Sequence, residues 1–586
     1  MHIKTALLRG AAFGAFAALA AGAAHAETTT TTKTVKHTRH HVQHVTKTVV
    51  EGSTGEEIRM LRSEVESLKA RLDAQAQVQQ ATAAQVAETQ VQVQAAAATA
   101  DSAQDKIETI PEQVNVAIGQ LPKPKTDKLY YKGVSITLGG FLEAADIERS
   151  HNMVSDIATN FSQIPFKGPG AATSGVGNAA TTGHSSENRL TGRQSRVSAL
   201  IQGDAAPDVH LAMYGEFDFQ AAAQTANSNE TNSYNPRIRH LYGTVDWDNF
   251  GGQSFGLHLL AGQNWSLATM NTKGITPRNE LTPPQIDAQY IPGFVFARQP
   301  QVRVTGDFLD HTLWAALSVE NAATTTTGAV PTNTTVSNAG QSGFNSANNV
   351  SINQIPDVIA KLAYEFKPFD RTLHVEAFGI MRDFDDRHAY PLITSNAREN
   401  QDTLVGSFGF GAVLQAIPSV LDLQVSGITG KGVGRYSASQ LSDATFGPNG
   451  KLNPITETSW LAGGTWHVMP ILDVYGFVGR DQEDHTSAVS VGGVNYGLGN
   501  GLLDARACNF EVSALAPAGS ACNVQTKSIQ QETVGFWHKI YQGGFGRVQW
   551  GMQYSHTERD SFAGLGGVAA KGDEDMLFTS FRYYPF

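Results

Sequence analysis

The chain contains 586 residues, with 43 lysines and arginines against 54 acidic residues and a formal net charge of −11. Its mean hydropathy is −0.23, and no apolar run of about 18 residues follows the first thirty, which excludes a helical membrane protein. Low hydropathy does not exclude a membrane β-barrel, because barrel strands carry only one apolar side chain in two.

The first 26 residues have the pattern of a secretory signal peptide. Lys4 and Arg9 supply positive charge, residues 11–21 form a short apolar stretch, and residues 24–26 fit a small-x-small cleavage site. We therefore expect residues 1–26 to be removed on export. A buried N-terminal helix is the alternative interpretation.

Residues 27–55 are rich in threonine, histidine and lysine. Such low complexity is typical of a flexible tether. The spacing of His37, His40, His41 and His44 is also compatible with Zn²⁺ binding. We favour a solvated tether, and we expect neither a metal ion nor a cofactor.

Residues 56–110 begin with a heptad pattern. The a and d positions hold Ile58, Leu61, Val65, Leu68 and Leu72, and charged residues flank them, as in a coiled coil. A single helix with such a polar surface is only marginally stable on its own. We therefore favour an oligomerising stalk over an isolated surface helix. Prolines in residues 111–130 predict a stiff linker.

From residue 131 to the end, the sequence predicts successive strands in which apolar and polar side chains alternate. In residues 210–220, one face holds Leu211, Met213, Phe217 and Phe219, and polar side chains share the other. In a membrane barrel the apolar face meets lipid and the polar face meets a water-filled lumen. About sixteen such strands are predicted: 135–147, 194–203, 209–220, 236–247, 255–264, 299–307, 312–320, 357–366, 371–381, 403–414, 420–429, 457–466, 471–481, 529–538, 543–554 and 576–586.

Short turns and long loops alternate between these strands. We place short turns at 204–208, 308–310, 367–370, 416–419, 467–470 and 539–542. An up-and-down sheet of this length must close, so the predicted fold class is all-β: a 16-stranded antiparallel transmembrane β-barrel over residues 131–586, preceded by an α-helical coiled coil. Sixteen strands leave an aqueous channel. The long loop 265–298 is expected to fold inward and narrow it; the alternative is a surface loop.

The two cysteines, Cys508 and Cys522, share one loop-like stretch of an exported chain. Export permits a disulfide. Closing a loop of about 15 residues would contribute roughly 3 kcal/mol in the chain-entropy model. We therefore expect a disulfide that stiffens the loop.

The alternation of apolar and polar residues along the strands predicts that several arginines point into the lumen. They are Arg196, Arg237, Arg239, Arg303 and Arg547. An arginine ladder selects anions, and the guanidinium fork suits carboxylates. Alternatively, these arginines pair with Glu216, Asp218 and Glu376 and only stabilise the wall. Both interpretations can hold together.

Four motifs, taken in order, resemble those of the DcaP-like trimeric outer-membrane porins. The C-terminal Phe586, the signal peptide and the short coiled coil match that layout as well. The resemblance extends over nearly the whole mature chain. The motifs are Pro236-Arg-Ile-Arg-His-Leu-Tyr-Gly243, Leu260-Ala-Gly-Gln-Asn-Trp-Ser266, Arg298-Gln-Pro-Gln-Val-Arg303 and Gly432-Val-Gly-Arg-Tyr436.

The resemblance implies a homotrimer in the outer membrane of a Gram-negative bacterium, with the stalk in the periplasm. It implies uptake of small anionic solutes, dicarboxylates among them, and Phe586 as a signal for the barrel assembly machinery. The expected surroundings are membrane lipid and lipopolysaccharide, without nucleic acid. By the same resemblance, a basic constriction is formed by Arg196, Arg237, Arg239, Arg298 and Arg303.

Arg582 departs from the expected pattern, because it shares a phase with Phe578, Tyr584 and Phe586. If that face meets lipid, Arg582 must lie near an interface or a subunit contact.

Competing functions are a general or carbohydrate-selective porin and a structural protein that tethers the envelope. We do not expect an enzyme, since no nucleophile motif accompanies His240, His374 or His556.

Overall fold

The computed structural model describes residues 128–586 apart from 154, 167–182, 222–233, 253–254, 289, 333, 340–348, 390–397, 509 and 511–512. The predicted signal peptide, tether, coiled coil and most of the linker lie outside the described residues. No helix among the described residues is long and apolar enough to cross a membrane.

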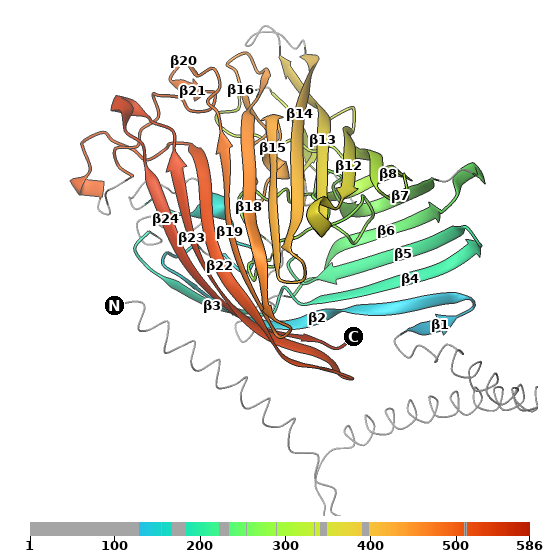
Figure 1. The fold of residues 1–586 in the computed structure, drawn as a ribbon. Helices are drawn as coiled ribbons and strands as arrows, with labels where there is room; N and C mark the ends of the chain where they lie inside the picture. Colours follow the sequence, from blue (N-terminus) through green and yellow to red (C-terminus); the bar gives the residue numbers. More distant parts are fainter. Residues whose placement is uncertain are drawn as a thin grey trace, which may run out of the picture. The chain divides into compact units, whose positions relative to one another are not determined.

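Sixteen antiparallel strands form a ring (Figure 1). Each pairs with the next in the ring, and the last pairs with the first. They are β2 (Val134–Arg149), β4 (Arg196–Ala206), β5 (Val209–Asp218), β6 (Arg237–Trp247), β7 (Gly256–Trp265), β8 (Arg298–Phe308), β9 (Leu313–Glu320), β12 (Asp357–Phe366), β13 (Leu373–Ala389), β14 (Arg398–Ile417), β15 (Leu421–Lys431), β18 (Thr456–Met469), β19 (Leu472–Glu483), β22 (Thr526–Gly543), β23 (Gly546–Ser561) and β24 (Lys571–Tyr584).

The closed barrel confirms the predicted fold class for the described part of the chain. β3 (Glu187–Thr191) pairs with the same strand, β2, as β4 does, and we count β3 and β4 as one interrupted strand. β1 (Leu129–Tyr131) forms a small hairpin with the start of β2. All sixteen predicted strands are present, although several are longer than expected. β13 and β14, for example, stay paired from Leu373 to Ala389.

The turn predicted at 539–542 is wrong. β22 continues to Gly543, and the turn lies at 544–545. A register shift between Lys539 and Tyr541 accounts for the difference, because the irregularity lets the chain bend slightly without ending the strand.

The long loops carry short elements of their own. Three small hairpins are β10 (Ser337–Ala339) with β11 (Asn349–Ser351), β16 (Ala444–Phe446) with β17 (Leu452–Pro454), and β20 (Val489–Val491) with β21 (Val494–Tyr496). The 3₁₀ turns are η2 (Phe161–Gln163), η3 (Phe250–Gly252), η5 (Pro368–Asp370), η6 (Gly434–Tyr436), η7 (Ser513–Leu515) and η8 (Leu565–Gly567).

Apolar side chains occupy both faces of the wall, for different reasons. Leu211, Met213 and Phe217 on β5 are exposed on the outer face. On the inner face, Phe477, Trp537 and other wall residues are buried against side chains of the long loops. The lumen therefore contains a packed core as well as space for water.

Candidate functional site

Five of the predicted arginines lie on one wall of the lumen. Arg196 is on β4, Arg237 and Arg239 are on β6, and Arg298 and Arg303 are on β8. Their neighbours Val197, Ile238 and Val302 are 53%, 44% and 52% exposed on the outer face. The alternation of the strands therefore directs the guanidinium groups of Arg196, Arg237, Arg239 and Arg303 inward, onto a sector of five strands. Arg298, the first residue of β8, shares the phase of Val302, and its guanidinium group lies over the rings of Trp265 and Phe296.

A β-bulge changes the alternation of β6. Glu216 of β5 pairs with His240, and the next residue, Phe217, pairs with Ile238, so Arg239 is the extra residue. As a result Arg239 and His240 are both buried, and Leu241 is the next exposed residue. Simple alternation would have turned His240 toward lipid, so sequence reasoning missed it as a site residue. Bulges commonly redirect side chains in this way.

Two of the arginines pair with the predicted acids. Arg237 donates two hydrogen bonds to Asp218, at 2.9 Å from Nε and 2.6 Å from Nη2. Arg239 donates to Glu216 at 2.5 Å and to Asp218 at 3.2 Å. The predicted acids thus hold the guanidinium groups in place and partly neutralise them.

Residues 266–297, which we call the transverse loop, enter the lumen. At its start, Gly274 N–H donates to Glu365 on β12 at 2.6 Å, and Lys361 of β12 donates to the carbonyl of Thr269 at 2.7 Å. Lys361 also pairs with Glu376 of β13 at 2.8 Å. The first part of the loop is therefore anchored on β12 and β13.

The second part of the transverse loop reaches the opposite wall. Ile286 N–H donates to Gln553 on β23 at 2.7 Å, and Gly293 N–H donates to Asp481 on β19 at 2.8 Å. Trp537 on β22 donates to the carbonyl of Pro284 at 2.8 Å. In the ring of sixteen, β19 is eight strands from β7, and β22 is eight strands from β8. The loop therefore crosses the barrel.

Another long loop supports this crossing. Both Ala158 and Thr159 donate backbone N–H groups to Oδ1 of Asp287, at 2.9 and 3.0 Å. Burial raises the pKa of the Asp287 carboxyl above its ordinary value. The side chains of Ile157, Phe161 and Ile286 join one buried apolar cluster.

The space between the transverse loop and the arginine wall is a cavity of about 220 Å³. The loop contributes Arg278 and Glu280, and the Arg278 guanidinium lies over the ring of Tyr214 at 5.9 Å. Arg298 lies nearby, over the rings of Trp265 at 4.9 Å and Phe296 at 5.1 Å. The lining residues are Arg196, Tyr214, Glu216, Arg239, His240, Tyr242, Asn264, Trp265, Arg278, Glu280 and Thr282.

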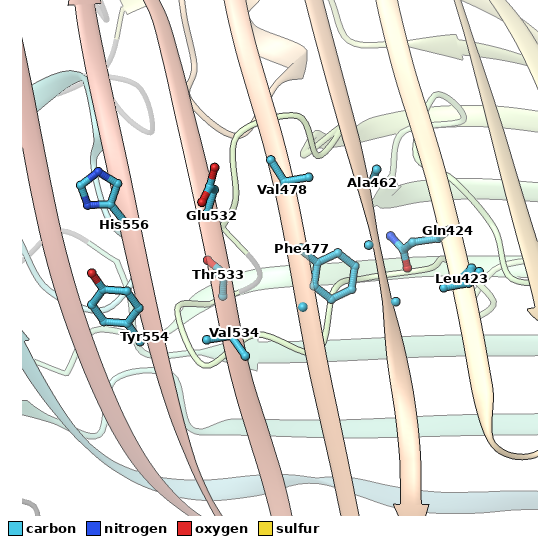
Figure 2. A pocket seen from close by; sticks show the side chains of 13 residues that line it. Leu423, Gln424, Ala462, Phe477, Val478, Glu532, Thr533, Val534, Tyr554 and His556 are labelled. Carbon is cyan, nitrogen blue, oxygen red and sulfur yellow. The ribbon is translucent and has the colours of Figure 1, made fainter.

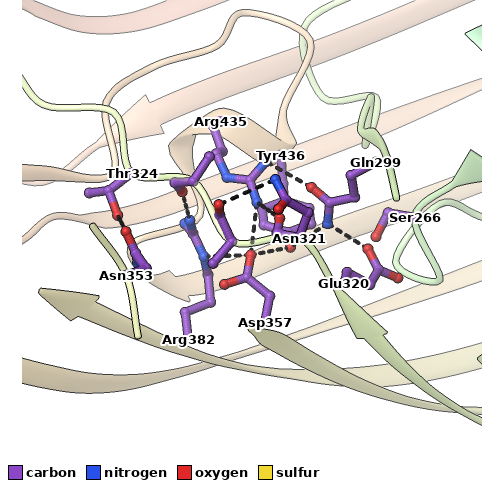
Figure 3. Close-up of polar contacts among 12 residues, drawn as sticks. Ser266, Gln299, Glu320, Asn321, Thr324, Asn353, Asp357, Arg382, Arg435 and Tyr436 are labelled. Atoms are coloured by element: carbon purple, nitrogen blue, oxygen red, sulfur yellow. Dashed lines mark hydrogen bonds and ion pairs between the residues drawn. The ribbon is translucent and has the colours of Figure 1, made fainter. Parts of the chain in front are cut away.

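A second polar cluster holds the loop after β15 against the wall (Figure 3). Asp357 on β12 accepts from Arg382 at 3.1 Å, from Arg435 at 2.8 Å and from the Tyr436 hydroxyl at 2.7 Å. Arg435 also donates to Gln299 at 2.9 Å. Arg435 and Tyr436 belong to the motif at 432–436, so this motif fixes a loop to the wall.

Of the predicted arginines, only Arg196 and Arg239 line the cavity itself, and Arg547 lies furthest along the chain from them. It lies over the ring of Tyr584 at 4.2 Å, close to the short turn between β22 and β23. Tyr584 in turn packs on Phe141, with ring centroids 5.2 Å apart, and Arg196 lies 5.3 Å over Phe141. Arg547 is therefore connected to the cavity through two aromatic rings.

Arg582 faces the lumen and not lipid. It pairs with Glu143 at 2.8 Å and lies over Trp537 at 4.4 Å. Phe578, which shares its phase, is fully buried in the interior cluster. The inner face of the last strand is thus mixed in polarity, which explains why its alternation looked poor in the sequence.

Cys508 and Cys522 form a disulfide, with Cα atoms 4.8 Å apart. Both sulfurs are buried with Phe166 and Ala570 from two other long loops. Nearby, the Arg506 guanidinium beside Asp504 holds the pKa of that carboxyl well below its usual range.

The terminal Phe586 is 67% exposed beyond β24. Within the described ranges, no group of His, Cys, Asp and Glu side chains is arranged to hold a metal ion.

The fold resembles that of a known outer-membrane channel. The structure of the outer membrane channel DcaP of Acinetobacter baumannii matches with a TM-score of 0.50 at 17% identity, covering 78% of this chain and 99% of that one. An anion-selective porin from Comamonas acidovorans gives 0.39 at 11% identity, covering 77% and 99%. OmpF of Salmonella typhi, in complex with daunomycin, gives 0.38 at 9% identity, covering 78% and 100%. No protein-family model matches the sequence, and no curated protein does.

Proposed function

We propose that this chain is an outer-membrane porin, a passive diffusion channel that prefers small hydrophilic anions such as dicarboxylates. The observation that carries the proposal is the charge around the cavity. Three guanidinium groups line the cavity, from Arg196, Arg239 and Arg278, and two carboxylates line it, from Glu216 and Glu280, an excess of one positive charge. Arg237, Arg298 and Arg303 lie on the same wall outside this lining, with Arg237 paired to Asp218.

The anion selectivity would come from the shape of the lumen and from the electrostatic field of its wall. The transverse loop fills the far side of the lumen and leaves the solute beside the basic wall. In a confined space bordered by protein, the excess positive charge raises the local concentration of anions. The carboxylate of a solute can replace water at the edge of a guanidinium group. It does not form a permanent complex there, because Glu216 and Asp218 compete for the same N–H donors.

The assembly and location are part of the proposal. We propose a homotrimer in the outer membrane, with residues 1–26 as a signal peptide and residues 56–110 as a periplasmic coiled-coil stalk on the tether 27–55. The barrel assembly machinery would recognise Phe586, and lipid and lipopolysaccharide would surround the outer wall. The apolar outer face supports membrane insertion.

The test is a reversal potential in a planar bilayer with a salt gradient, followed by block with succinate. We expect anion preference in the wild-type protein. The double variant Arg237→Ala, Arg239→Ala removes the two guanidinium groups that donate to Glu216 and Asp218, so selectivity should move toward cations. The exposed Lys571→Ala variant is the control and should change neither quantity. Cation selectivity in the wild type, or an unchanged double variant, would refute the arginine filter.

A general porin is the second candidate, and the ion pairs of Arg237 and Arg239 favour it. If these pairs neutralise the wall completely, the reversal potential will lie near zero, and neutral sugars will block as well as succinate. The same bilayer experiment therefore separates the two candidates.

A further inference from the structure

The cavity beside the transverse loop has two chemically different ends. Its guanidinium groups come from β4 and β6 of the wall and from Arg278 of the loop, which lies over the ring of Tyr214 on β5. Beside β7, in contrast, the Asn264 side chain donates from Nδ2 to Oε1 of the loop residue Glu280 at 3.1 Å. The cavity therefore has a basic end over β4, β5 and β6 and an acidic end beside β7.

Backbone pairing fixes Glu280 at the acidic end. The N–H group of Thr272 donates to the carbonyl of Asn279 at 2.7 Å, and that of Leu281 donates to the carbonyl of Met270 at 2.7 Å. The residues on both sides of Glu280 are thus tied to the start of the transverse loop, which is itself anchored on β12. The position of this carboxyl group is consequently defined by the wall.

The two acids of the lining differ in their partners. Glu216 accepts from Arg239 at 2.5 Å, so its charge is already compensated. Glu280 forms no ion pair with any residue that the structure describes. Burial raises the pKa of the Glu280 carboxyl, although the positive charge of Arg303 opposes this shift. A carboxylate that is removed from water without a close counter-ion is destabilised, so a cationic group of a solute would be stabilised beside Glu280.

Arg278 supplies a positive side chain two residues before Glu280. Its φ of 70° lies in the left-handed region that favours glycine, so the backbone is strained at this residue. Residues in such conformations persist where the surrounding structure holds them, and they cluster at ligand sites. One short segment of the loop thus presents a side chain of each sign to the same cavity.

The net charge of the lining indicates which solutes match it. Three guanidinium groups and two carboxylates leave one net positive charge. A solute with two carboxylates and one ammonium group carries one net negative charge at neutral pH and balances this lining. A simple dicarboxylate carries two negative charges, exceeds the charge of the lining and leaves Glu280 without a counter-ion.

We propose that this cavity selects acidic amino acids, with the ammonium group held at Glu280 and the carboxylates held at the basic end. The inference rests on the proposed function and names a class of solute within it. An ammonium group donates up to three hydrogen bonds, for which Glu280 and the Thr282 hydroxyl are acceptors. The rings of Tyr242 and Trp265 in the same lining add a cation–π attraction.

A wider hollow on the outer face lacks this combination (Figure 2). It has a volume of about 940 Å³ and crosses β15, β18, β19, β22 and β23. The described residues that line it include one carboxylate, from Glu532, and no guanidinium group. Figure 2 shows Glu532 on β22, the strand that also carries Val534, a residue 53% exposed on the outer face. Glu532 is therefore a matched control position for the loss of one negative charge.

The test is competitive binding to the purified full-length protein in detergent, followed by saturation-transfer NMR. L-glutamate and glutarate share a carbon chain and differ by the ammonium group, and both are present in one sample at pH 7. We expect L-glutamate to bind about tenfold more tightly than glutarate, as for one hydrogen bond to a charged group. Glu280→Gln should remove this preference, whereas Glu280→Asp should retain it and Glu532→Gln should leave it unchanged.

Arg278→Gln should weaken the binding of both solutes and leave their ratio unaltered, because it removes a group of the basic end. Equal binding of the two solutes to the wild-type protein would overturn the inference, and so would binding of neither. A preference for L-glutamate that survives Glu280→Gln would overturn it as well. The heat-dependent gel mobility of each variant verifies that the barrel is folded. The NMR readout needs no ion flow, so a cation-selective reversal potential would refute the proposed function separately.

Discussion

Nε of Arg582 on the last strand lies 2.8 Å from Oε1 of Glu143 on the first strand. The Ser580 hydroxyl donates to the same oxygen at 2.6 Å. Both charged side chains are at most 9% exposed. This contact lies at the seam where the barrel closes, between segments more than 430 residues apart in the sequence.

The first prediction concerns this seam. Arg582→Met leaves the buried Glu143 carboxylate without its charged partner, and breaking a buried pair costs about 3–5 kcal/mol. We expect the folded barrel to unfold at a lower temperature in SDS, measured by its shift in gel mobility. Lys571→Met removes an exposed pair with Asp560 and should cost less than about 1 kcal/mol. Equal effects of the two variants would contradict the seam's importance.

The second prediction concerns the anchor of the transverse loop on β18 and β19. Gly293 has a φ of 90°, and a Cβ there would collide with the carbonyl oxygen of Trp460. Gly293→Ala should displace the loop, destabilise the protein by about 1–3 kcal/mol and change single-channel conductance. Gly492→Ala is the control, since Gly492 also has positive φ but no atom lies within 4 Å of a Cβ. If both variants conduct alike, the loop does not define the pore.

The third prediction tests the loop's own contribution to selectivity. Arg278 lines the cavity, and its guanidinium lies over Tyr214. Arg278→Gln should lower the anion-to-cation permeability ratio and leave thermal stability nearly unchanged, because the residue is on a loop. Arg506→Gln changes the same charge in another loop and should leave the ratio unaltered. The reversal potential is the measurement, and a shift in both variants would indicate only a net-charge effect.

The fourth prediction is a pH dependence of the disulfide-bearing loop. Asp504 accepts from the Arg506 side chain at 2.9 and 2.8 Å and from the backbone N–H of Ala521 at 2.9 Å. Its lowered pKa stabilises the loop above the unfolded value of about 3.9. That contribution is lost as the pH falls through the folded pKa.

Hydrogen exchange of peptides covering 500–525 measures this dependence. Protection should persist from pH 7 to about 4 in the wild-type protein and decline below that range. In Arg506→Gln most of this stabilisation is absent, so protection should be weaker at pH 7 and should decline less below about pH 4. Peptides from the transverse loop are the internal control, and an unchanged profile in Arg506→Gln would refute the role of the ion pair.

The alternation of apolar and polar residues was sufficient to predict the barrel, because successive side chains of a strand point to opposite faces of the sheet. It failed where the backbone departs from a period of two. The bulge at Arg239 directs His240 inward, and only its pairing with β5 reveals this. Arg582 was ambiguous, since Phe578 on the same face packs in an interior apolar cluster that the sequence did not predict.

The inward course of the transverse loop was expected, but its contacts were not. Its partners Gln553 and Asp481 lie 267 and 188 residues further along the chain. Nothing in the local sequence of a polar wall residue identifies it as an acceptor for a distant loop. The basic wall was predicted, whereas the cavity it forms with Arg278 and Glu280 depends on these long-range contacts.

The transverse loop is attached near both ends of a diameter, so it acts as a chord of the barrel. A segment held at one wall can swing like a lid, but a chord can move only if contacts at one wall break. In the proposed channel, a force that flattens the barrel would load the same segment that narrows the lumen. Barrel roundness and solute cut-off would then be mechanically coupled.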